Sequence, residues 1–379
     1  MSGVISQIAS ILGYGVQSAA QVVAVIGSQI VTGWTEATIR VGVEIMPWTA
    51  DLGITYRQPQ GGLPLKVNEG DTAQIYIGTT PLITGYVVGV VDSKGPDSHE
   101  VRLQIASKSM DLVDCSAEFS TYQMNSTNAL AVAQRVAAFA GINVIAVGDA
   151  GNTDIQQFSV ILTETAYEVI ERLARLAGVL FYDRPDGNVT MSRVGSTRMA
   201  SGFVMGGNVE HCTRARSMAG RYSTITAVLQ NTVMLFTSPN EADYVGQMEA
   251  ISSPAKATDV TITRNRPLLI PVELGDANAA VAQQRVLWEA ARRWGRSRPI
   301  TVTCDSWVDS EGKIWCPNTL APFTDEAGSS IDYVIGEITF RKGSEGTRAD
   351  VVLMPPAAFQ PEPILLPAQS NEAVQAINS

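Results

Sequence analysis

Short runs in which apolar and polar residues alternate recur along most of this chain, and they constrain its fold more than any other feature. Residues 36–45 read EATIRVGVEI and residues 99–107 read HEVRLQIAS, with an apolar side chain at every second position. A spacing of two places those side chains on one face of a strand. Residues typical of turns separate the runs, so the sequence predicts a mainly β (α+β) fold built from barrels or sandwiches.

The first β-rich stretch, residues 21–115, is predicted to form a β-barrel domain. Two β-branched runs flank the Gly27-Ser28 turn, and two more flank residues 78–81, which read GTTP. Short apolar runs around such turns are typical of β-hairpins.

Residues 116–200 differ in character and are predicted to form a small α/β domain between two barrels. Residues 126–141 have helical apolar spacing, and Gly141 suits a C-terminal cap. Thr165 and Glu168 form a capping box at the start of a second helix, which Gly178 ends. A hairpin through the turn Arg184–Gly187 closes the domain.

The remaining chain is predicted to form a second β-barrel domain over 201–355, followed by an extended tail over 356–379. Strands are expected in several runs, including DVTITRN at 259–265. An inserted helix is expected over 276–295, with Asp276 as its N-cap. The tail is too rich in proline for regular structure.

Two distant segments resemble each other. Tyr86–Gly89 reads YVVG and Tyr333–Gly336 reads YVIG, and a Lys-Gly pair followed by an alternating strand comes after each. Two unrelated hairpins could produce the same match. If the repeat is real, the chain carries two similar barrels, and three chains around an axis would present six of them to a six-fold partner.

The first 20 residues form an N-terminal extension whose role is open. Residues 1–35 contain no charged side chain, and residues 3–20 have the spacing of a weakly amphipathic helix. We expect this helix to pack on a partner or a neighbouring domain. A membrane segment is the alternative, although Ser, Gln and Gly interrupt the run and no basic residue precedes it.

The composition argues against stable nucleic-acid binding and against metal sites. The net charge is −10, and phosphate backbones are bound by Lys and Arg. The sequence has four cysteines and two histidines, without the close Cys and His spacing of a zinc site. We predict buried free thiols in a reducing compartment, and no cofactor.

Nucleophilic catalysis would have to use one of the two histidines. His99 lies in a turn that enters a strand, where a solvated side chain is expected. His211 and Cys212 are neighbours, and neighbours on a strand point to opposite faces. Paired carboxylates for sugar cleavage remain the enzymatic alternative, since 37 acids are available, but they are scattered through turns. We therefore predict no enzyme and assign no catalytic, cofactor-binding or metal residue.

One basic cluster stands out against this acidic background, and it lies beside several tryptophans. We expect these arginines on the outer face of a helix next to an acidic partner, with a nucleic-acid groove as the alternative. The tryptophans suit packing or a subunit interface. The residues are Arg285, Arg292, Arg293, Arg296 and Arg298, with Trp288, Trp294, Trp307 and Trp315.

Three ordered segments carry a family resemblance. The first runs from VNEGDTAQIYIG at 67–78 through TGYV to SKSMDLVDCSA at 107–117. The second is TETAYEVIERLARLAGVLFYDRPDGNVTMSR at 163–193. The third runs from RNRPLLI at 264–270 through VLWEAARR and DSWVDSEGKIWCPNTLAPFTDEAG to VLMPPAAF, ending at 359. Together they resemble the baseplate hub proteins of Mu-like contractile-tailed bacteriophages.

The resemblance implies a virion structural protein of the viral tail baseplate, assembled in the host bacterial cytoplasm. It implies a homotrimeric hollow ring that joins the six-fold tail tube to the three-fold central spike and leaves a channel for DNA ejection. The implied partners are other copies of the chain, the central spike protein, tail tube or tube-initiator proteins, and baseplate wedge proteins. DNA would pass only transiently, without membrane insertion. A hub-associated cell-wall hydrolase is the alternative function.

Overall fold

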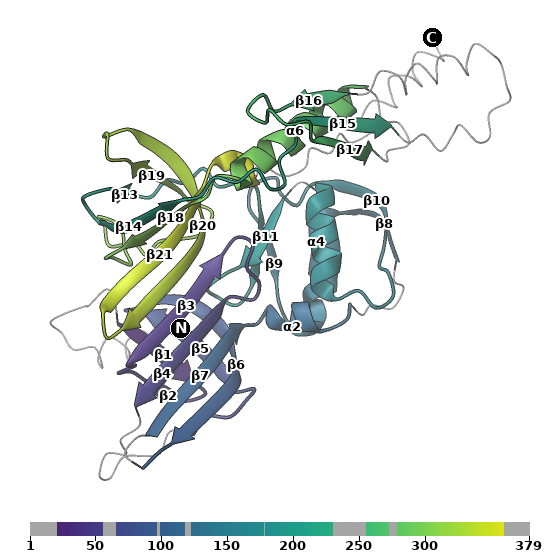
Figure 1. Cartoon of the computed structure of the whole chain (residues 1–379). Helices are drawn as coiled ribbons and strands as arrows, with labels where there is room; N and C mark the ends of the chain where they lie inside the picture. The colour runs from purple at the N-terminus through teal and green to yellow at the C-terminus, as the bar shows by residue number, and fades with distance from the viewer. Residues whose placement is uncertain are drawn as a thin grey trace, which may run out of the picture. The chain divides into compact units, whose positions relative to one another are not determined.

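A computed structural model describes most of the chain (Figure 1). The described residues are 21–55, 66–96, 99–117, 123–177, 179–229, 255–272 and 279–359. The predicted N-terminal helix, the caps at Gly178 and Asp276, and the tail beyond residue 359 lie outside them. No helix within these ranges is long and apolar enough to cross a membrane.

The chain divides into two compact units, each described here by itself. The larger unit contains residues 1–174, 179–214 and 300–354. The smaller unit contains residues 175–178, 215–299 and 355–379. The sequence predicts two barrels, an α/β domain and two terminal segments, which is a finer division than these two units. Those domain limits stay a prediction.

Most strands of the larger unit belong to one sheet, which has two halves. The first half is built from the strands β1 (Val22–Ile26), β2 (Gln29–Val31), β3 (Glu36–Gly42), β4 (Thr49–Thr55), β5 (Thr72–Ile77), β6 (Thr80–Lys94) and β7 (His99–Ser107). The second half is built from β13 (Phe203–Val204), β14 (Val209–Arg214), β18 (Ile300–Cys304), β19 (Leu320–Thr324), β20 (Ser330–Gly343) and β21 (Gly346–Met354). These strands confirm the mainly β fold that the alternating runs predict.

The two halves repeat one strand order. Hydrogen-bonded neighbours run β1-β5-β6-β7-β4-β3 in the first half and β13-β19-β20-β21-β18-β14 in the second. Strands at equivalent positions also follow one another in the same order along the chain. One pairing differs, since β1 is antiparallel to β5 whereas β13 is parallel to β19.

The two segments of the sequence repeat form equivalent hairpins in these halves. The first segment gives β6 and β7, and the second gives β20 and β21. Each hairpin has a register shift at its Tyr-Val-x-Gly motif, between Val87 and Gly89 in one and between Ile335 and Glu337 in the other. The repeated motif therefore marks a bulge, where a strand bends and twists more strongly.

The halves are not two separate sheets, a connection that the prediction of two similar barrels did not include. Strand β3 pairs with β4 on one side and with β20 on the other, so hydrogen bonds run from one half into the next. Among the described strands, a single bridge between Met205 and Val209 links β13 to β14, and no pairing links β1 or β2 to β3. Closure of each half into a barrel stays a prediction.

The α/β segment between the halves agrees with the local sequence signals. Its helices are α3 (Ala129–Ala137) and α4 (Ala166–Ala177), which follow the short helix α2 (Met110–Asp114). Its strands are β8 (Gln123–Asn128), β9 (Val144–Ala146), β10 (Asp154–Ser159), β11 (Leu180–Asp183) and β12 (Val189–Ser192). Thr165 and Glu168 form the predicted capping box, with reciprocal hydrogen bonds of 2.8 and 3.2 Å. Gly141 has the left-handed φ of 63° that its predicted capping position requires.

The smaller unit is a three-stranded sheet with one helix. Strand β15 (Thr224–Leu229) pairs with β16 (Lys256–Thr258) and β17 (Pro267–Val272), and Val286 of α6 (Ala279–Arg296) packs in its core. The short 3-10 helix η3 (Pro356–Phe359) packs on α6. Gly295 permits this contact, because a Cβ there would lie 2.6 Å from the Ala358 nitrogen.

Two local predictions are wrong in this unit. Residues 259–265 form a loop rather than a strand, because the Asp259 carboxylate accepts hydrogen bonds from the Thr261 N–H and hydroxyl and so stabilises a turn. The first residues of the predicted extended tail, 356–359, are helical, and Ala358 and Phe359 are buried.

Candidate functional site

The histidines do not form catalytic arrangements. His99 begins β7, and its Nε2 lies 2.5 Å from Asp92 on the neighbouring strand β6. Hydrogen bonds from Lys94 and His99 hold the pKa of the Asp92 carboxyl below its usual value. This His99 contact is a cross-strand hydrogen bond within a hairpin, rather than the solvated turn that the sequence suggested.

The neighbouring His211 and Cys212 are also unsuited to nucleophilic chemistry. The His211 ring contacts the Thr213 hydroxyl at 3.2 Å. Burial raises the pKa of the Cys212 thiol, which favours the protonated, unreactive form.

All four cysteines are free, as predicted, but only Cys304 is fully buried. Within the described ranges, no group of three or more His, Cys, Asp or Glu side chains could hold a metal ion.

The basic cluster near α6 is largely engaged within the smaller unit. Arg293 pairs with Glu289 at 2.5 Å, and Arg285 and Arg292 lie over the Trp288 ring. Trp307 and Trp315 lie in the core of the larger unit, where both are almost fully buried, so they have the packing role that is one of the two predicted for the tryptophans.

The candidate site is structural: it is the set of contacts that joins the two halves and the α/β segment into one body. The first contact is the seam, defined as the paired strands β3 and β20. Its register runs from Gly42 opposite Glu337 to Ala37 opposite Lys342, and Arg40 pairs with Glu337 across it at 2.5 Å. The main-chain hydrogen bonds of this ladder join the two halves whatever side chains the strands carry.

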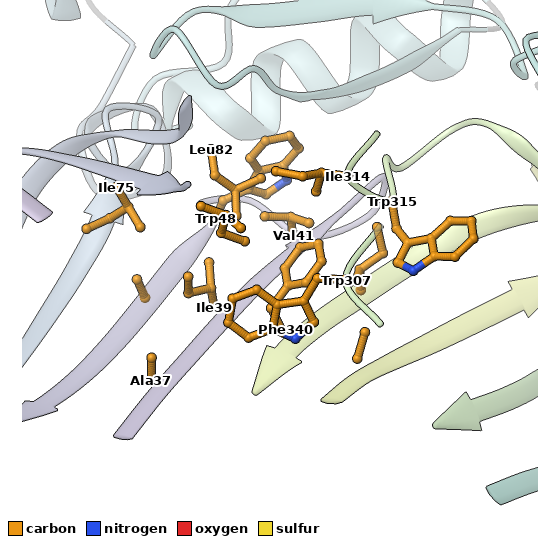
Figure 2. Close-up of a cluster of buried hydrophobic side chains, with 14 of the residues drawn as sticks. Ala37, Ile39, Val41, Trp48, Ile75, Leu82, Trp307, Ile314, Trp315 and Phe340 are labelled. Carbon is orange, nitrogen blue, oxygen red and sulfur yellow. The ribbon is translucent and has the colours of Figure 1, made fainter. Parts of the chain in front are cut away.

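One hydrophobic core lies beneath the seam. Figure 2 shows Ile39 and Val41 of β3 beside Phe340 of β20, with Trp48 and Trp307 close by. The Trp307 and Phe340 rings meet edge to face, with centroids 5.6 Å apart. The buried residues of both halves form a single cluster, so the halves share a core as well as a sheet.

A buried carboxylate fixes the α/β segment to the first half. Asp183, at the end of β11, accepts hydrogen bonds from the Trp48 N–H at 2.8 Å and from the Ser107 hydroxyl at 2.5 Å. Burial raises the pKa of Asp183 to about 6, although hydrogen bonds from Ser107, Ser109 and Trp48 oppose the rise. We name this contact the acidic junction.

An asparagine fixes the same segment to the second half. Asn318 accepts a 2.7 Å hydrogen bond from the Gly195 N–H, and its amide donates to Tyr182, Ser192 and Arg193. Its φ of 59° is left-handed, a conformation that Asn tolerates better than most residues. We name this contact the amide junction; nothing in the local sequence pattern identified either junction.

Known protein families match this chain in three separate segments. Three family models match in chain order. They are the Mu phage baseplate assembly protein GpP-like N-terminal domain at 21–105, the baseplate hub protein gp44-like second domain at 109–193, and the GpP fourth domain at 278–362. The baseplate hub protein gp44 of Escherichia phage Mu is 26% identical over 350 residues, covering 90% of this chain and 88% of that protein. The chain belongs to the Mu-like baseplate hub family.

Solved structures agree with this membership. The 43 kDa tail protein of prophage MuSo2 from Shewanella oneidensis is 28% identical, with a TM-score of 0.76 over 91% of the hub chain and 100% of that protein. The tail protein from Neisseria meningitidis MC58 is 18% identical and shares the fold, with a TM-score of 0.73 over 90% and 98% of the two chains. The hub chain is thus a structural component of a phage tail baseplate, and its relatives are structural tail proteins.

Proposed function

We propose that three hub chains form a closed ring that joins the six-fold tail tube to the three-fold central spike. The ring surrounds a channel through which DNA leaves the virion. Its neighbours are the spike protein, tail tube or tube-initiator proteins, and the baseplate wedge proteins. The chain acts mechanically and is not an enzyme.

The repeated strand order is the observation that supports this proposal. Each chain carries two halves with the same strand order. Three chains around one axis therefore supply six similar halves. The seam keeps the two modules of a chain at a fixed spacing, because it is built from main-chain hydrogen bonds. A partner with six-fold symmetry then meets similar surfaces at each of its six positions.

The charge of the chain fits a channel that DNA crosses without adhering. The net charge is −10, and binding to phosphate backbones needs clustered cations. Replacing the acids that line the bore with Lys should slow DNA ejection. Ejection at the wild-type rate would contradict this part of the proposal.

The free thiols fit assembly in the host bacterial cytoplasm before release. None of the four cysteines forms a disulfide, as expected in a reducing compartment.

Stoichiometry tests the ring directly. Light scattering on the purified chain should give three times the 40.5 kDa chain mass. Images of tail particles viewed along the axis should show three copies around an open bore, with six similar lobes. A different copy number in the particle, or a closed centre, would overturn the proposal.

A further inference from the structure

The smaller unit contains a pocket with an unusual concentration of positive charge. Its volume is about 310 Å³, and it is formed by the loop before β15, the loop between β16 and β17, and the end of α6. The pocket wall includes no acidic residue. Its polar side chains include Arg216, Arg221, Arg264, Arg298, Thr261 and Thr263.

One of the four arginines is part of the scaffold. Arg221 is 7% exposed, donates two hydrogen bonds to Asp259 and contacts the Thr261 hydroxyl. Burial favours the neutral form of Asp259, but hydrogen bonds from Thr261 and Arg221 outweigh it and hold the pKa of this carboxyl below its usual value. The pair therefore stays ionised and fixes the loop that carries the other pocket residues.

The other three arginines have no acidic partner among the described residues. Arg216 and Arg264 line the pocket and are exposed to solvent. The Arg298 guanidinium lies 4.7 Å over the Trp294 ring, and its Nε is buried with no hydrogen-bond partner in the part of the chain that the structure describes. A buried guanidinium nitrogen without an acceptor is costly, so an anion that accepts a hydrogen bond from it would be stabilised here.

We propose that this pocket binds carboxylate side chains from an acidic segment of another baseplate protein. The planar fork of arginine matches a carboxylate through two parallel hydrogen bonds, and the two threonine hydroxyls can donate as well. A DNA duplex fits less well, because its phosphates need cations spread along a surface rather than converging on one small pocket. The net charge of −10 also repels a long polyanion, whereas a short acidic segment meets only the local field.

Direct binding to the full-length chain tests the proposal. The probe is a capped hexapeptide of alternating Asp and Glu, titrated by calorimetry at low salt. The matched probe replaces every Asp with Asn and every Glu with Gln, and further titrations use inorganic phosphate and a short DNA duplex. We expect binding of the acidic peptide alone, and weaker binding as salt increases.

The variant Arg216→Glu with Arg264→Glu should lower the affinity for the acidic peptide at least about tenfold. Each exchange replaces a charge-assisted hydrogen bond with repulsion. Both residues are exposed, so the fold should persist, whereas replacing Arg221 would remove the scaffold ion pair. The control is Lys66→Glu with Lys313→Glu in the larger unit, two exposed positions at which the same exchange changes the net charge equally. It should bind the acidic peptide as the wild type does.

Three results would overturn the proposal: equal binding of the acidic and neutral peptides, unchanged affinity in the double variant, or preference for phosphate or duplex DNA. The proposal is independent of the trimeric ring. Light scattering on the same variant tests the two proposals separately. Loss of peptide binding should leave the number of chains in the ring unchanged.

Discussion

The two halves of the large sheet share a strand order but fill their cores differently. The first half is mainly aliphatic, with Ile75, Ile83 and Leu103 among its fully buried residues. The second half buries aliphatic residues too, but it contains more aromatic side chains, among them Trp315 and Phe203, whose ring centroids lie 4.7 Å apart. The comparison shows that backbone pairing, rather than side-chain identity, is what the two halves have in common. It explains why only a short Tyr-Val-x-Gly motif survives as a visible repeat.

The largest expected effect tests whether the halves behave as one body. Trp315 is fully buried and donates a 2.9 Å hydrogen bond to the Ser306 carbonyl. Trp315→Ala should lower the free energy of unfolding by about 4 kcal/mol, and Leu103→Ala in the first half by about 3 kcal/mol. Denaturant titration followed by hydrogen exchange measures both. If the halves share a core, each variant loosens both halves, and loss of protection confined to the mutated half would contradict this.

The two junctions differ in chemistry, which gives a pH test. The Asp183 carboxyl has a pKa of about 6 when folded and an ordinary pKa of 3.8 when unfolded. Between these values the folded state holds more protons, so the free energy of unfolding should fall as pH rises, by about 3 kcal/mol in total. Above pH 6 the loss is complete.

Asp183→Asn should remove this fall, because an amide does not titrate. Denaturation midpoints measured from pH 4 to pH 7 check the change in slope. A variant of the amide junction should retain the wild-type slope; the same slope in Asp183→Asn would show that another group causes it.

The amide junction allows side-chain and backbone effects to be separated. Asn318→Ala removes the side-chain hydrogen bonds of the amide junction and places alanine at positive φ, which should cost about 3 kcal/mol. Asn318→Gly loses the same hydrogen bonds but accepts the backbone conformation, so it should be less destabilised by about 1 kcal/mol. Thermal unfolding of both variants measures the difference. Equal loss in both would mean that the left-handed conformation contributes nothing.

The smallest expected effect lies on the surface of the seam. Arg40 and Glu337 are both partly exposed, so Arg40→Ala should cost less than about 1 kcal/mol, and less still at high salt. The double variant Arg40→Ala with Glu337→Ala gives the coupling between the two side chains. A coupling of several kcal/mol would show that side chains, and not the backbone ladder, hold the halves together.

Local signals in the sequence predicted local structure well. The alternating runs, the capping box at Thr165 and the left-handed Gly141 all correspond to observed elements. Contacts between distant residues could not be predicted in this way. Asp183 reaches Trp48, and Asn318 reaches Gly195, through pairings that no periodicity encodes. The same limit explains why the strand predicted at 259–265 is a loop. Asp259 pairs with distant Arg221 and stabilises a turn, and these contacts outweigh the strand preference of the β-branched residues.

The smaller unit is inserted in the large sheet between two neighbouring strands, β14 and β18. Arg214 and Ile300 face each other in the β14–β18 ladder, so residues 215–299 depart and return at adjacent positions. In the first half, a short connection from Gly42 to Thr49 links the equivalent strands β3 and β4. A short loop can thus make the same connection as the whole of residues 215–299. Pairing within the β14–β18 ladder therefore does not depend on how long the chain between the two strands is.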